Sequence, residues 1–430
     1  MIVYLTALVT FILQCSIMFY FYFRKQKQSM RQLINAYTIN GSLNEYLYFI
    51  LIPCLNEGKV IKRTLQKLLK LSGRKEIIVI DDDSDDDTLA QIRSVSGPIS
   101  IIERKLPNAR TGKGDSLNSA MPTITKMIHE QKLDPARCIV GVVDADGALS
   151  ANSFYKLTNA FENNQVDSVQ LRVKMRNPHT ILQTFQDIEF FVVNHLIQTI
   201  RAKLNAVALC GNGQFFRYST IVKRLGEKPW GNALLEDYEL TLRMEFKDIK
   251  TQYISDAYVD QEALTSVKRL IKQRARWAQG GFNCLKYLGH IIHSKDMPES
   301  QKLDAYFFFF QPIINVLADF SIMFLTIAFI RRNLYKPIHL LTLLVIMVFF
   351  GLFFGLAFTM IYLREIRLTE AFDLLPKLTK AFASRRLTPL KVILAIFLVS
   401  YIYAVLFLSM MTAIYHLIIG QHTWDKTKRL

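Results

Sequence analysis

The sequence predicts an α/β domain with parallel strands, placed between segments that cross a membrane. Hydrophobic residues make up 51% of the 430 residues, yet 21% are charged, more than a bundle of membrane spans alone would carry. Long uncharged stretches lie near both ends of the chain, whereas short apolar runs alternate with amphipathic stretches between residues 45 and 290. This composition excludes a disordered chain, a disulfide-rich secreted module and a purely soluble enzyme.

The charge balance limits the partners. Lys and Arg (53 residues) outnumber Asp and Glu (36 residues), which gives a net charge of +17. An anionic membrane surface, phosphorylated small molecules or nucleic acid could each match this charge. No nucleic-acid partner is expected, because the sequence has no zinc-finger spacing, RNA-binding signature or basic helix with heptads. The five cysteines are scattered without a CxxC pair, which indicates reduced thiols in a cytosolic domain.

The first predicted membrane segment is an N-terminal anchor at residues 1–23. No charged residue precedes Arg24, Lys25 and Lys27, and about 20 apolar residues cross the hydrocarbon core. Because the positive charges follow the segment, its C-terminal side is expected in the cytosol. It has neither a basic start nor a small-residue cleavage site, so we expect the anchor to remain uncleaved.

Further apolar stretches follow residue 300. Residues 305–363 hold two predicted spans, the second with Gly351 and Gly355 in a GxxxG spacing that favours helix packing. A third span is predicted at residues 392–419. The amphipathic residues 364–391 are expected to lie along the cytosolic face against anionic lipid headgroups.

The number of spans conflicts with the charge of the tail. One span before a cytosolic domain and three after it would place the C-terminus outside, but residues 420–430 are basic, which favours the inside. Either one segment after residue 300 is interfacial or re-entrant, or the charge rule fails for this tail. In both cases we expect a multi-pass protein of the cell membrane, with residues 45–290 in the cytosol.

Within the soluble domain, three short apolar runs are predicted strands. Residues 48–53 and 77–80 are followed by polar turns, and residues 60–71 between them have helical spacing, which together predicts a βαβ unit. Residues 139–143 form a further buried strand. In open α/β sheets the ligand binds beyond the carboxyl ends of the strands, so the residues that follow each strand are candidates for a site.

Acidic and amide side chains follow all three strands. They are Pro53, Asn56 and Glu57 after the first, a run that begins with Asp81 and Asp82 after the second, and Asp144 and Asp146 after the third. One such cluster could merely cap a helix or form a turn, but three at successive strand ends indicate a shared site. Asp144 and Asp146 offer hard oxygen ligands that suit Mg²⁺ or Mn²⁺ and leave positions for substrate phosphates.

Two downstream motifs add charge. Lys113 lies between two glycines on a loop that can approach a phosphate or nucleotide edge, although the loop is not a Walker A motif. Glu236 and Asp237 begin a helical run. One of these carboxylates could act as a general base, or both could only complement the helix dipole.

Gln273, Arg276 and Trp277 lie within one predicted helical turn. An arginine can neutralise a diphosphate, and a sugar can stack on an indole ring. The alternative is that the Trp–Arg pair is only an anchor at the membrane interface.

Taken in order, these motifs resemble the membrane-bound, processive family 2 glycosyltransferases, which include synthases of cellulose, chitin, hyaluronan and poly-N-acetylglucosamine. The resemblance covers residues 48–281 and extends to the flanking spans, and its most specific part is Gln273-x-x-Arg276-Trp277 with the upstream Glu236-Asp237 pair. It implies a GT-A fold, the fold of nucleotide-diphospho-sugar transferases, inserted between transmembrane helices. It also implies a UDP-sugar donor, a divalent cation (Mg²⁺ or Mn²⁺) and inversion at the anomeric carbon.

The resemblance implies a role for each matching residue. Asp237 matches the catalytic base, next to Glu236, and Asp144 and Asp146 match the metal–diphosphate motif. The remaining assignments are Pro53, Glu57, Asp81, Asp82, Lys113 and Asp144 to the donor nucleotide, and Gln273, Arg276, Trp277, Gly211 and Gly213 to the donor diphosphate and the acceptor.

The expected function is transfer of a sugar, with UDP-GlcNAc or UDP-glucose as donor, to the end of a growing β-linked polysaccharide of extracellular, capsular or biofilm type. Export would be coupled to synthesis, and an accessory membrane subunit could take part. A non-processive enzyme that adds one sugar to a polyprenyl phosphate or a glycolipid is the first alternative. The Gln273-x-x-Arg276-Trp277 element favours the synthase, whereas the small number of spans leaves room for this alternative. The second alternative is a catalytically inactive membrane scaffold or channel, which the retained acidic motifs oppose.

Overall fold

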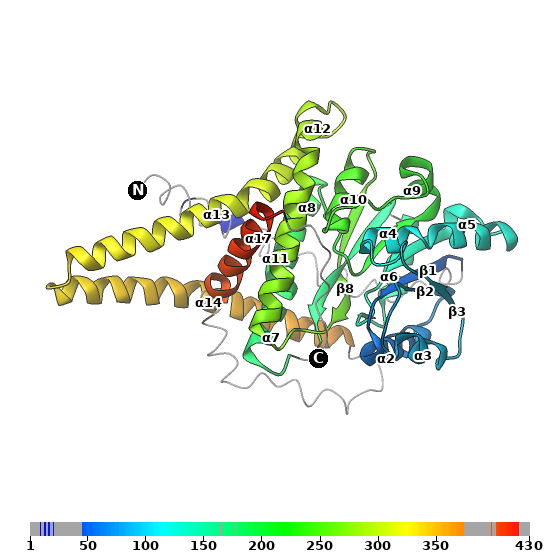
Figure 1. The fold of residues 1–430 in the computed structure, drawn as a ribbon, viewed down its shortest axis with the longest axis horizontal. Coiled ribbons are helices and arrows are strands. Elements are labelled where there is room, and N and C mark those ends of the chain that lie inside the picture. The colour runs from blue at the N-terminus through cyan, green and yellow to red at the C-terminus, as the bar shows by residue number, and fades with distance from the viewer. Residues whose placement is uncertain are drawn as a thin grey trace.

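The computed structural model describes residues 45–163, 166–176, 178–373, 397 and 401–420, together with isolated positions among the first 20 residues. The predicted anchor at residues 1–23, apart from those positions, lies outside the described residues. The same holds for most of the amphipathic segment at residues 364–391 and for the basic tail after residue 420. Figure 1 shows the arrangement of the described elements.

An eight-stranded mixed sheet forms the centre of the domain, in the order β3-β2-β1-β4-β7-β6-β8-β5. The strands are β1 (Leu47–Cys54), β2 (Lys75–Asp81), β3 (Ile99–Glu103), β4 (Cys138–Val142), β5 (Ala148–Leu149), β6 (Ser168–Met175), β7 (Gln214–Arg217) and β8 (Thr251–Gln261). Strands β3, β2, β1 and β4 are parallel, whereas β7 runs antiparallel to both β4 and β6. The three predicted strands are therefore confirmed, but the sheet is mixed rather than parallel: β6 and β8 pair in parallel, whereas β7 and β5 run antiparallel to their neighbours.

The missed half of the sheet has a physical reason. Every residue of β6 is buried, yet Gln170, Arg172 and Lys174 alternate with its apolar residues and remove the hydrophobic run that marks a central strand. Two of these side chains have hydrogen-bond partners inside the protein, although Nε of Arg172 has none within the described residues. Gln170 donates to the backbone carbonyl of Asn212, and Arg172 pairs with Glu365.

Helices cover both faces of the sheet because β1 is apolar on both. Tyr48 and Ile50 belong to the core beneath one layer, and Phe49 and Leu51 to the core beneath the other. The helices of the first layer are α2 (Gly58–Leu69), α3 (Thr88–Arg93) and α6 (Ser153–Asn163); those of the second are α4 (Lys113–Asn118), α5 (Met121–Glu130), α9 (Tyr218–Leu225) and α10 (Glu236–Glu245).

A second group of helices joins this domain to the C-terminal part of the chain. Its members are α7 (Ile181–Ile188), the π-helical turn η2 (Glu189–Asn194), α8 (His195–Leu204), α11 (Val267–Asn283), the turn η3 (Cys284–Tyr287) and α12 (Leu288–His293). Phe185, Phe191 and Leu270 of this group share a core with Phe358 and Tyr401. In Figure 1, α11 stands between the sheet side of the molecule and the C-terminal helix α17 (Leu408–Ile418).

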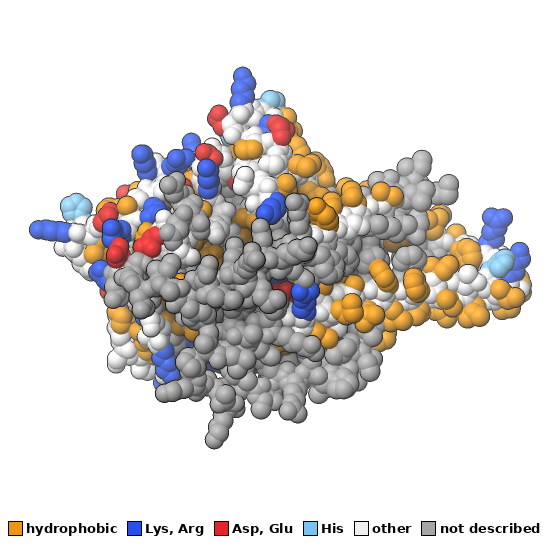
Figure 2. Space-filling view, turned by 180° about the vertical axis from the view of Figure 1, so that it is seen from behind, with side chains coloured by type: hydrophobic (Ala, Val, Ile, Leu, Met, Phe, Trp, Pro, Cys, Tyr) orange, Lys and Arg blue, Asp and Glu red, His pale blue; other side chains and the backbone are white. Residues whose placement is uncertain are grey.

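Two long helices project from the domain as arms, α13 (Glu299–Arg332) and α14 (Pro337–Asp373) (Figure 1). Figure 2 shows hydrophobic side chains along the projecting part, and Phe324, Leu341 and Phe349 are among those exposed there. In the part of the chain that the structure describes, α13 is the one helix long and apolar enough to cross a membrane, with a mean hydropathy of 2.2. The two predicted spans at residues 305–363 lie in α13 and α14, and the part of the predicted span 392–419 that the structure describes, from residue 401 on, is helical. Their insertion in a membrane stays a prediction.

Candidate active site

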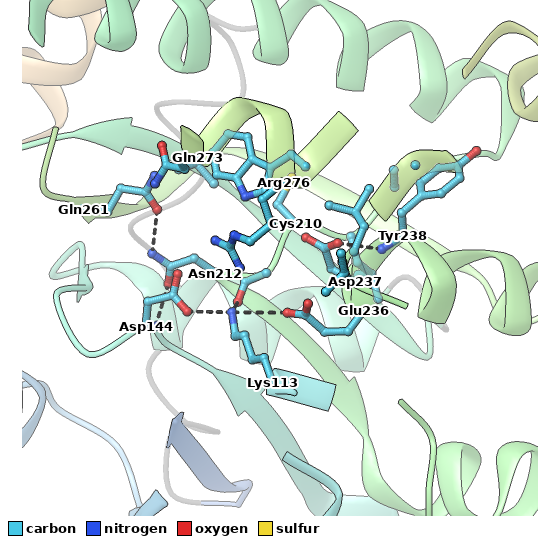
Figure 3. A pocket seen from close by; sticks show the side chains of 18 of the residues that line it. Lys113, Asp144, Cys210, Asn212, Glu236, Asp237, Tyr238, Gln261, Gln273 and Arg276 are labelled. Atoms are coloured by element: carbon cyan, nitrogen blue, oxygen red, sulfur yellow. Dashed lines mark hydrogen bonds and ion pairs between the residues drawn. The ribbon is translucent and has the colours of Figure 1, made fainter. Parts of the chain in front are cut away.

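One cavity of about 540 Å³ lies beyond the carboxyl ends of β1, β4 and β8, the position predicted for the site. It begins near Pro53 and Asp82 and continues past Asp237 to Phe308 of α13 and Met410 of α17. Figure 3 shows its central part. The same space therefore joins the sheet edge to the two helices α13 and α17.

The cavity brings most of the predicted site residues together. In its wall lie Pro53, Glu57, Asp82, Lys113, Asp144, Asp146, Gly211, Glu236, Asp237, Gln273, Arg276 and Trp277. Two predicted residues do not line it. Asp81 is fully buried and accepts a hydrogen bond from the backbone N–H of Ser84. Gly213 directly precedes β7.

Asp82 offers an acceptor at the end of the cavity nearest to β1 and β2. Its Oδ1 accepts a 2.6 Å hydrogen bond from the buried Arg104, while its Oδ2 has no hydrogen-bond partner within the described residues. Burial raises the pKa of Asp82, and the Arg104 guanidinium opposes that shift. An unsatisfied buried carboxylate oxygen is costly, so a ligand N–H that donates to it is favoured.

Lys113 is the central cation of the site (Figure 3). Its Nζ lies 2.7 Å from Oδ1 of Asp144, 2.8 Å from the carbonyl oxygen of Gly211 and 3.4 Å from Oε1 of Glu236. Burial disfavours the charged amine, but attraction to Asp144 and Glu236 outweighs burial and raises the pKa of Lys113. Lys113 therefore stays charged beside these carboxylates.

Gly211 and Gly213 are required by this packing. A Cβ at Gly211 would lie 2.9 Å from Nζ of Lys113 and 3.3 Å from Oδ2 of Asp237. Gly213 has φ +76° and would place a Cβ 2.6 Å from Cγ1 of Val259. Gly211 thus allows the backbone to pass close to the charged centre, and Gly213 allows it to pass close to β6 and β8.

Asp144 and Asp146 fit a divalent cation in their chemistry. Both are carboxylates in the cavity wall, and Oδ2 of Asp146 is held by the backbone N–H of Glu262 at 2.9 Å. No group of three or more His, Cys, Asp or Glu side chains suited to a metal occurs within the described residues. Two carboxylates are enough for Mg²⁺ or Mn²⁺ when substrate phosphates and water complete the coordination.

Asp237 lies at the first turn of α10, beside Glu236. Its Oδ1 accepts a 2.7 Å hydrogen bond from the backbone N–H of Tyr238. Burial and the Glu236 carboxylate raise the pKa of Asp237 to about 7, against the lowering effect of Lys113. A carboxylate with this pKa can accept a proton near neutral pH.

The predicted helical turn with Gln273, Arg276 and Trp277 is confirmed as part of α11, and all three side chains line the cavity. Arg276 points into the cavity above Lys113 and Asp144 in Figure 3. The Trp277 ring meets the Phe190 ring edge-on at 5.9 Å and lies 4.2 Å from the Arg274 guanidinium.

The family described as "Glycosyltransferase like family 2" matches residues 46–280, more than half of the chain. The chain belongs to glycosyltransferase family 2. The matched range contains every predicted site residue, and it ends before α13.

The sequence similarity to two relatives extends beyond this domain. The β-monoglucosyldiacylglycerol synthase of Trichormus variabilis is 25% identical over 334 residues, which cover 75% of this chain and 66% of that protein. The poly-β-1,6-N-acetyl-D-glucosamine synthase of Staphylococcus epidermidis is 25% identical over 362 residues, which cover 82% of this chain and 80% of that protein.

A solved structure supports the fold. The mannosyltransferase PcManGT from Pyrobaculum calidifontis, in complex with GDP-Man and Mn²⁺, superposes with a TM-score of 0.52 at 15% identity, over 78% of this chain and 93% of that chain. The predicted GT-A fold of this glycosyltransferase is confirmed, with a mixed sheet.

Two site residues of this glycosyltransferase were missed by the sequence analysis. Asn212 accepts a hydrogen bond from the backbone N–H of Asp144 and donates to Oε1 of Gln261 at 3.2 Å (Figure 3). This chain of amides fixes the backbone at Asp144. Asn212 could have been found from its position between Gly211 and Gly213, whereas Gln261 carries no local signal.

The pH dependence of transfer should report Asp237. The base must be deprotonated to act, so kcat/KM should fall as the pH drops below about 7, the pKa that burial and Glu236 give Asp237. Glu236→Gln removes a negative charge and should move this limb to lower pH. Initial rates of the wild type and the variant, measured across the pH range, check the direction, and an unmoved limb would assign the limb to another group.

Proposed function

We propose that this enzyme transfers a sugar from a UDP-sugar, with inversion at the anomeric carbon, to the end of a growing β-linked polysaccharide at the cytosolic face of a membrane. The observation that carries this proposal is the continuous cavity. It joins the buried acceptor of Asp82 and the cluster around Lys113 to the base Asp237, and then to helix α13.

The UDP-sugar donor would lie with its uracil ring near Asp82. The N3–H of uracil is a donor that matches the unsatisfied Oδ2 of this residue. Pro53 and Glu57 line the same end of the cavity, and Asp81 supports the turn behind it through Ser84. UDP-GlcNAc and UDP-glucose are the favoured donors, since relatives are named as synthases of poly-N-acetylglucosamine and of a glucosyl lipid.

The chain supplies the groups that the chemistry needs. Asp237 accepts the proton of the attacking hydroxyl, and Lys113 and Arg276 neutralise negative charge on the departing UDP. Asp144 and Asp146 would hold Mg²⁺ or Mn²⁺. When bound, the cation stabilises the charge that develops on the diphosphate.

The acceptor would approach from the side of α13. Trp277 lines the cavity and offers an aromatic face that can hold the terminal sugar within reach of Asp237. The exposed apolar side chains of α13 and α14 would lie in the bilayer, so the protein would be a multi-pass membrane protein with its catalytic domain in the cytosol. The basic segments would meet anionic lipids, and an accessory subunit could join at the same helices.

Product size tests this proposal. Membranes that contain the enzyme, incubated with excess UDP-GlcNAc or UDP-glucose, should form a long polymer that can be sized by gel or mass spectrometry. Trp277→Ala should shorten or abolish this polymer while UDP binding persists, because the indole meets the acceptor rather than the nucleotide. A wild-type product of one sugar on a lipid, even with excess donor, would contradict the polymerase assignment.

That contradicting outcome describes the second candidate, a single transfer to a polyprenyl phosphate or a glycolipid. It is favoured by the apolar end of the cavity, where Phe308, Pro312 and Met410 lie beside α11, and by the name of the Trichormus relative. The inactive scaffold is opposed by the geometry, since four acidic side chains of the motifs line one cavity (Asp144, Asp146, Glu236 and Asp237).

A further inference from the structure

The π-helical turn η2 places Glu189 against α11, the helix that carries Trp277. One extra residue per turn in a π-helix redirects the side chains that follow, and such turns are frequent at functional sites. Here α7 passes directly into η2, and Glu189 and Phe190 both line the cavity. The turn therefore places a carboxylate and an aromatic ring where an unbroken α-helix would direct different side chains.

Glu189 binds the arginine that holds Trp277. Oε2 of Glu189 accepts a 2.9 Å hydrogen bond from Nη2 of Arg274. Arg274 is only 6% exposed. The Arg274 guanidinium lies 4.2 Å from the centre of the Trp277 ring and 4.9 Å from that of Phe190. A desolvated guanidinium on two aromatic rings is a strong contact, so the carboxylate orients the arginine and the arginine orients the indole.

The same oxygen of Glu189 also binds the C-terminal helical segment. The Tyr401 hydroxyl, one residue before the π-helical turn η5 (Ile402–Phe407), donates to Oε2 of Glu189 at 2.9 Å. Neither Tyr401 nor Arg274 is among the residues that line the cavity, so both contact Trp277 or Glu189 from behind the wall.

We propose that Glu189 is the positioning residue for Trp277. Through Arg274 it fixes the indole in the cavity wall. Because Tyr401 binds the same carboxylate, the position of the indole also depends on the docking of the segment at Tyr401. The proposal rests on the role of Trp277 at the acceptor in the proposed function. It adds that Trp277 is held in place for the acceptor only when three segments meet, namely η2, α11 and the segment at Tyr401. The donor end of the cavity, at Asp82, has no part in this chain of contacts.

The chain offers a matched control. Tyr362 of α14 also donates its hydroxyl to a carboxylate near this turn, at 2.7 Å from Oδ2 of Asp187. Tyr362→Phe and Tyr401→Phe therefore each remove one hydroxyl between a C-terminal helix and the α7–η2 segment. Only the second hydroxyl lies on the path to Trp277.

The first readout is the exposure of the indole. The chain has three tryptophans, so Trp230→Phe and Trp424→Phe leave Trp277 as the sole tryptophan fluorophore of the full-length protein in detergent or nanodiscs. Glu189→Gln and Tyr401→Phe should increase acrylamide quenching of this fluorophore, and Tyr362→Phe should not. Unchanged quenching in Glu189→Gln, or an equal change in both Tyr→Phe variants, would overturn the proposal.

The second readout is kinetic and uses the otherwise wild-type chain, so it does not depend on the tryptophan replacements. With a short β-linked GlcNAc or glucose oligosaccharide as acceptor, Glu189→Gln should raise the acceptor KM about tenfold or more, because a misplacement of about 1 Å can cost on the order of 10²-fold. Tyr401→Phe should raise it less, Arg274→Lys should lie between wild type and Trp277→Ala, and UDP affinity should not change.

The two levels of the proposal fail differently. If Trp277→Ala leaves the acceptor KM unchanged, the acceptor role of Trp277 in the proposed function is wrong, and the quenching experiment still decides whether Glu189 positions the ring. If Trp277→Ala raises the KM but Glu189→Gln and Tyr401→Phe do not, the positioning role of Glu189 is wrong and the proposed function stands.

Discussion

Asp237→Asn should reduce turnover by about 10²–10⁴-fold, the usual contribution of a positioned general base, while the affinity for the UDP-sugar stays near that of the wild type. Asn keeps the size of the side chain and an oxygen that can accept from the Tyr238 backbone N–H, as Asp237 does now. The change therefore removes only the group that accepts the proton. Single-turnover rates and UDP binding measured on the same preparation separate chemistry from donor affinity.

The matched control for this variant is Glu236→Gln, which alters the adjacent carboxylate. Glu236 lies 3.4 Å from Lys113 and contributes to the raised pKa of Asp237. It should therefore change the pH optimum more than the maximal rate. Near-normal turnover in Asp237→Asn, together with a large loss in Glu236→Gln, would transfer the role of base to Glu236.

Asp144→Asn and Asp146→Asn should each lower transfer by on the order of 10²–10³-fold, because an ion on the diphosphate supplies several kcal/mol to the transition state. EDTA should have the same effect on the wild type, and Mn²⁺ should restore activity. In Asp144→Asn, Lys113 keeps an oxygen that can accept its hydrogen bond but loses the negative charge 2.7 Å from its Nζ, so this variant should also hold Lys113 less tightly.

Binding of Mn²⁺ in the presence of UDP, followed by electron paramagnetic resonance, gives a readout that is independent of turnover. Asp256→Asn is the control, since it removes a carboxylate that pairs with Lys156 outside the cavity. Full activity in EDTA, or unchanged Mn²⁺ binding in both cavity variants, would show that these carboxylates do not bind the cation.

The end of the cavity proposed for the donor was largely predictable from the sequence, for a physical reason. Among the parallel neighbours β2, β1 and β4, each buried strand is a short apolar run, and the polar residues that follow it must lie at the carboxyl edge of the sheet. The sequence alone therefore places Asp82 and Asp144 at one edge. Asp81, which the same rule assigns to the site, does not line the cavity; its Oδ2 accepts a hydrogen bond from the backbone N–H of Ser84.

The part of the cavity wall proposed for the acceptor was less predictable because its contacts are long-range. Glu189 and Arg274 are 85 residues apart, and Glu189 and Tyr401 are 212 residues apart. No local pattern indicates a π-helical turn or such pairs. Gln261 was missed for the same reason, since its role depends on Asn212, which lies 49 residues earlier.

The shared wall between the catalytic domain and α13 bears on how the enzyme can be divided. Tyr238, the neighbour of the proposed base Asp237, stacks on Phe308 of α13 at 3.6 Å, and Arg201, whose side chain is 11% exposed, pairs with Asp304 of the same helix. A fragment that ended before residue 299 would expose these surfaces to water and leave Arg201 without its counter-ion. We therefore expect the catalytic unit of this enzyme to be larger than its glycosyltransferase domain, and its minimal active form to include the start of α13.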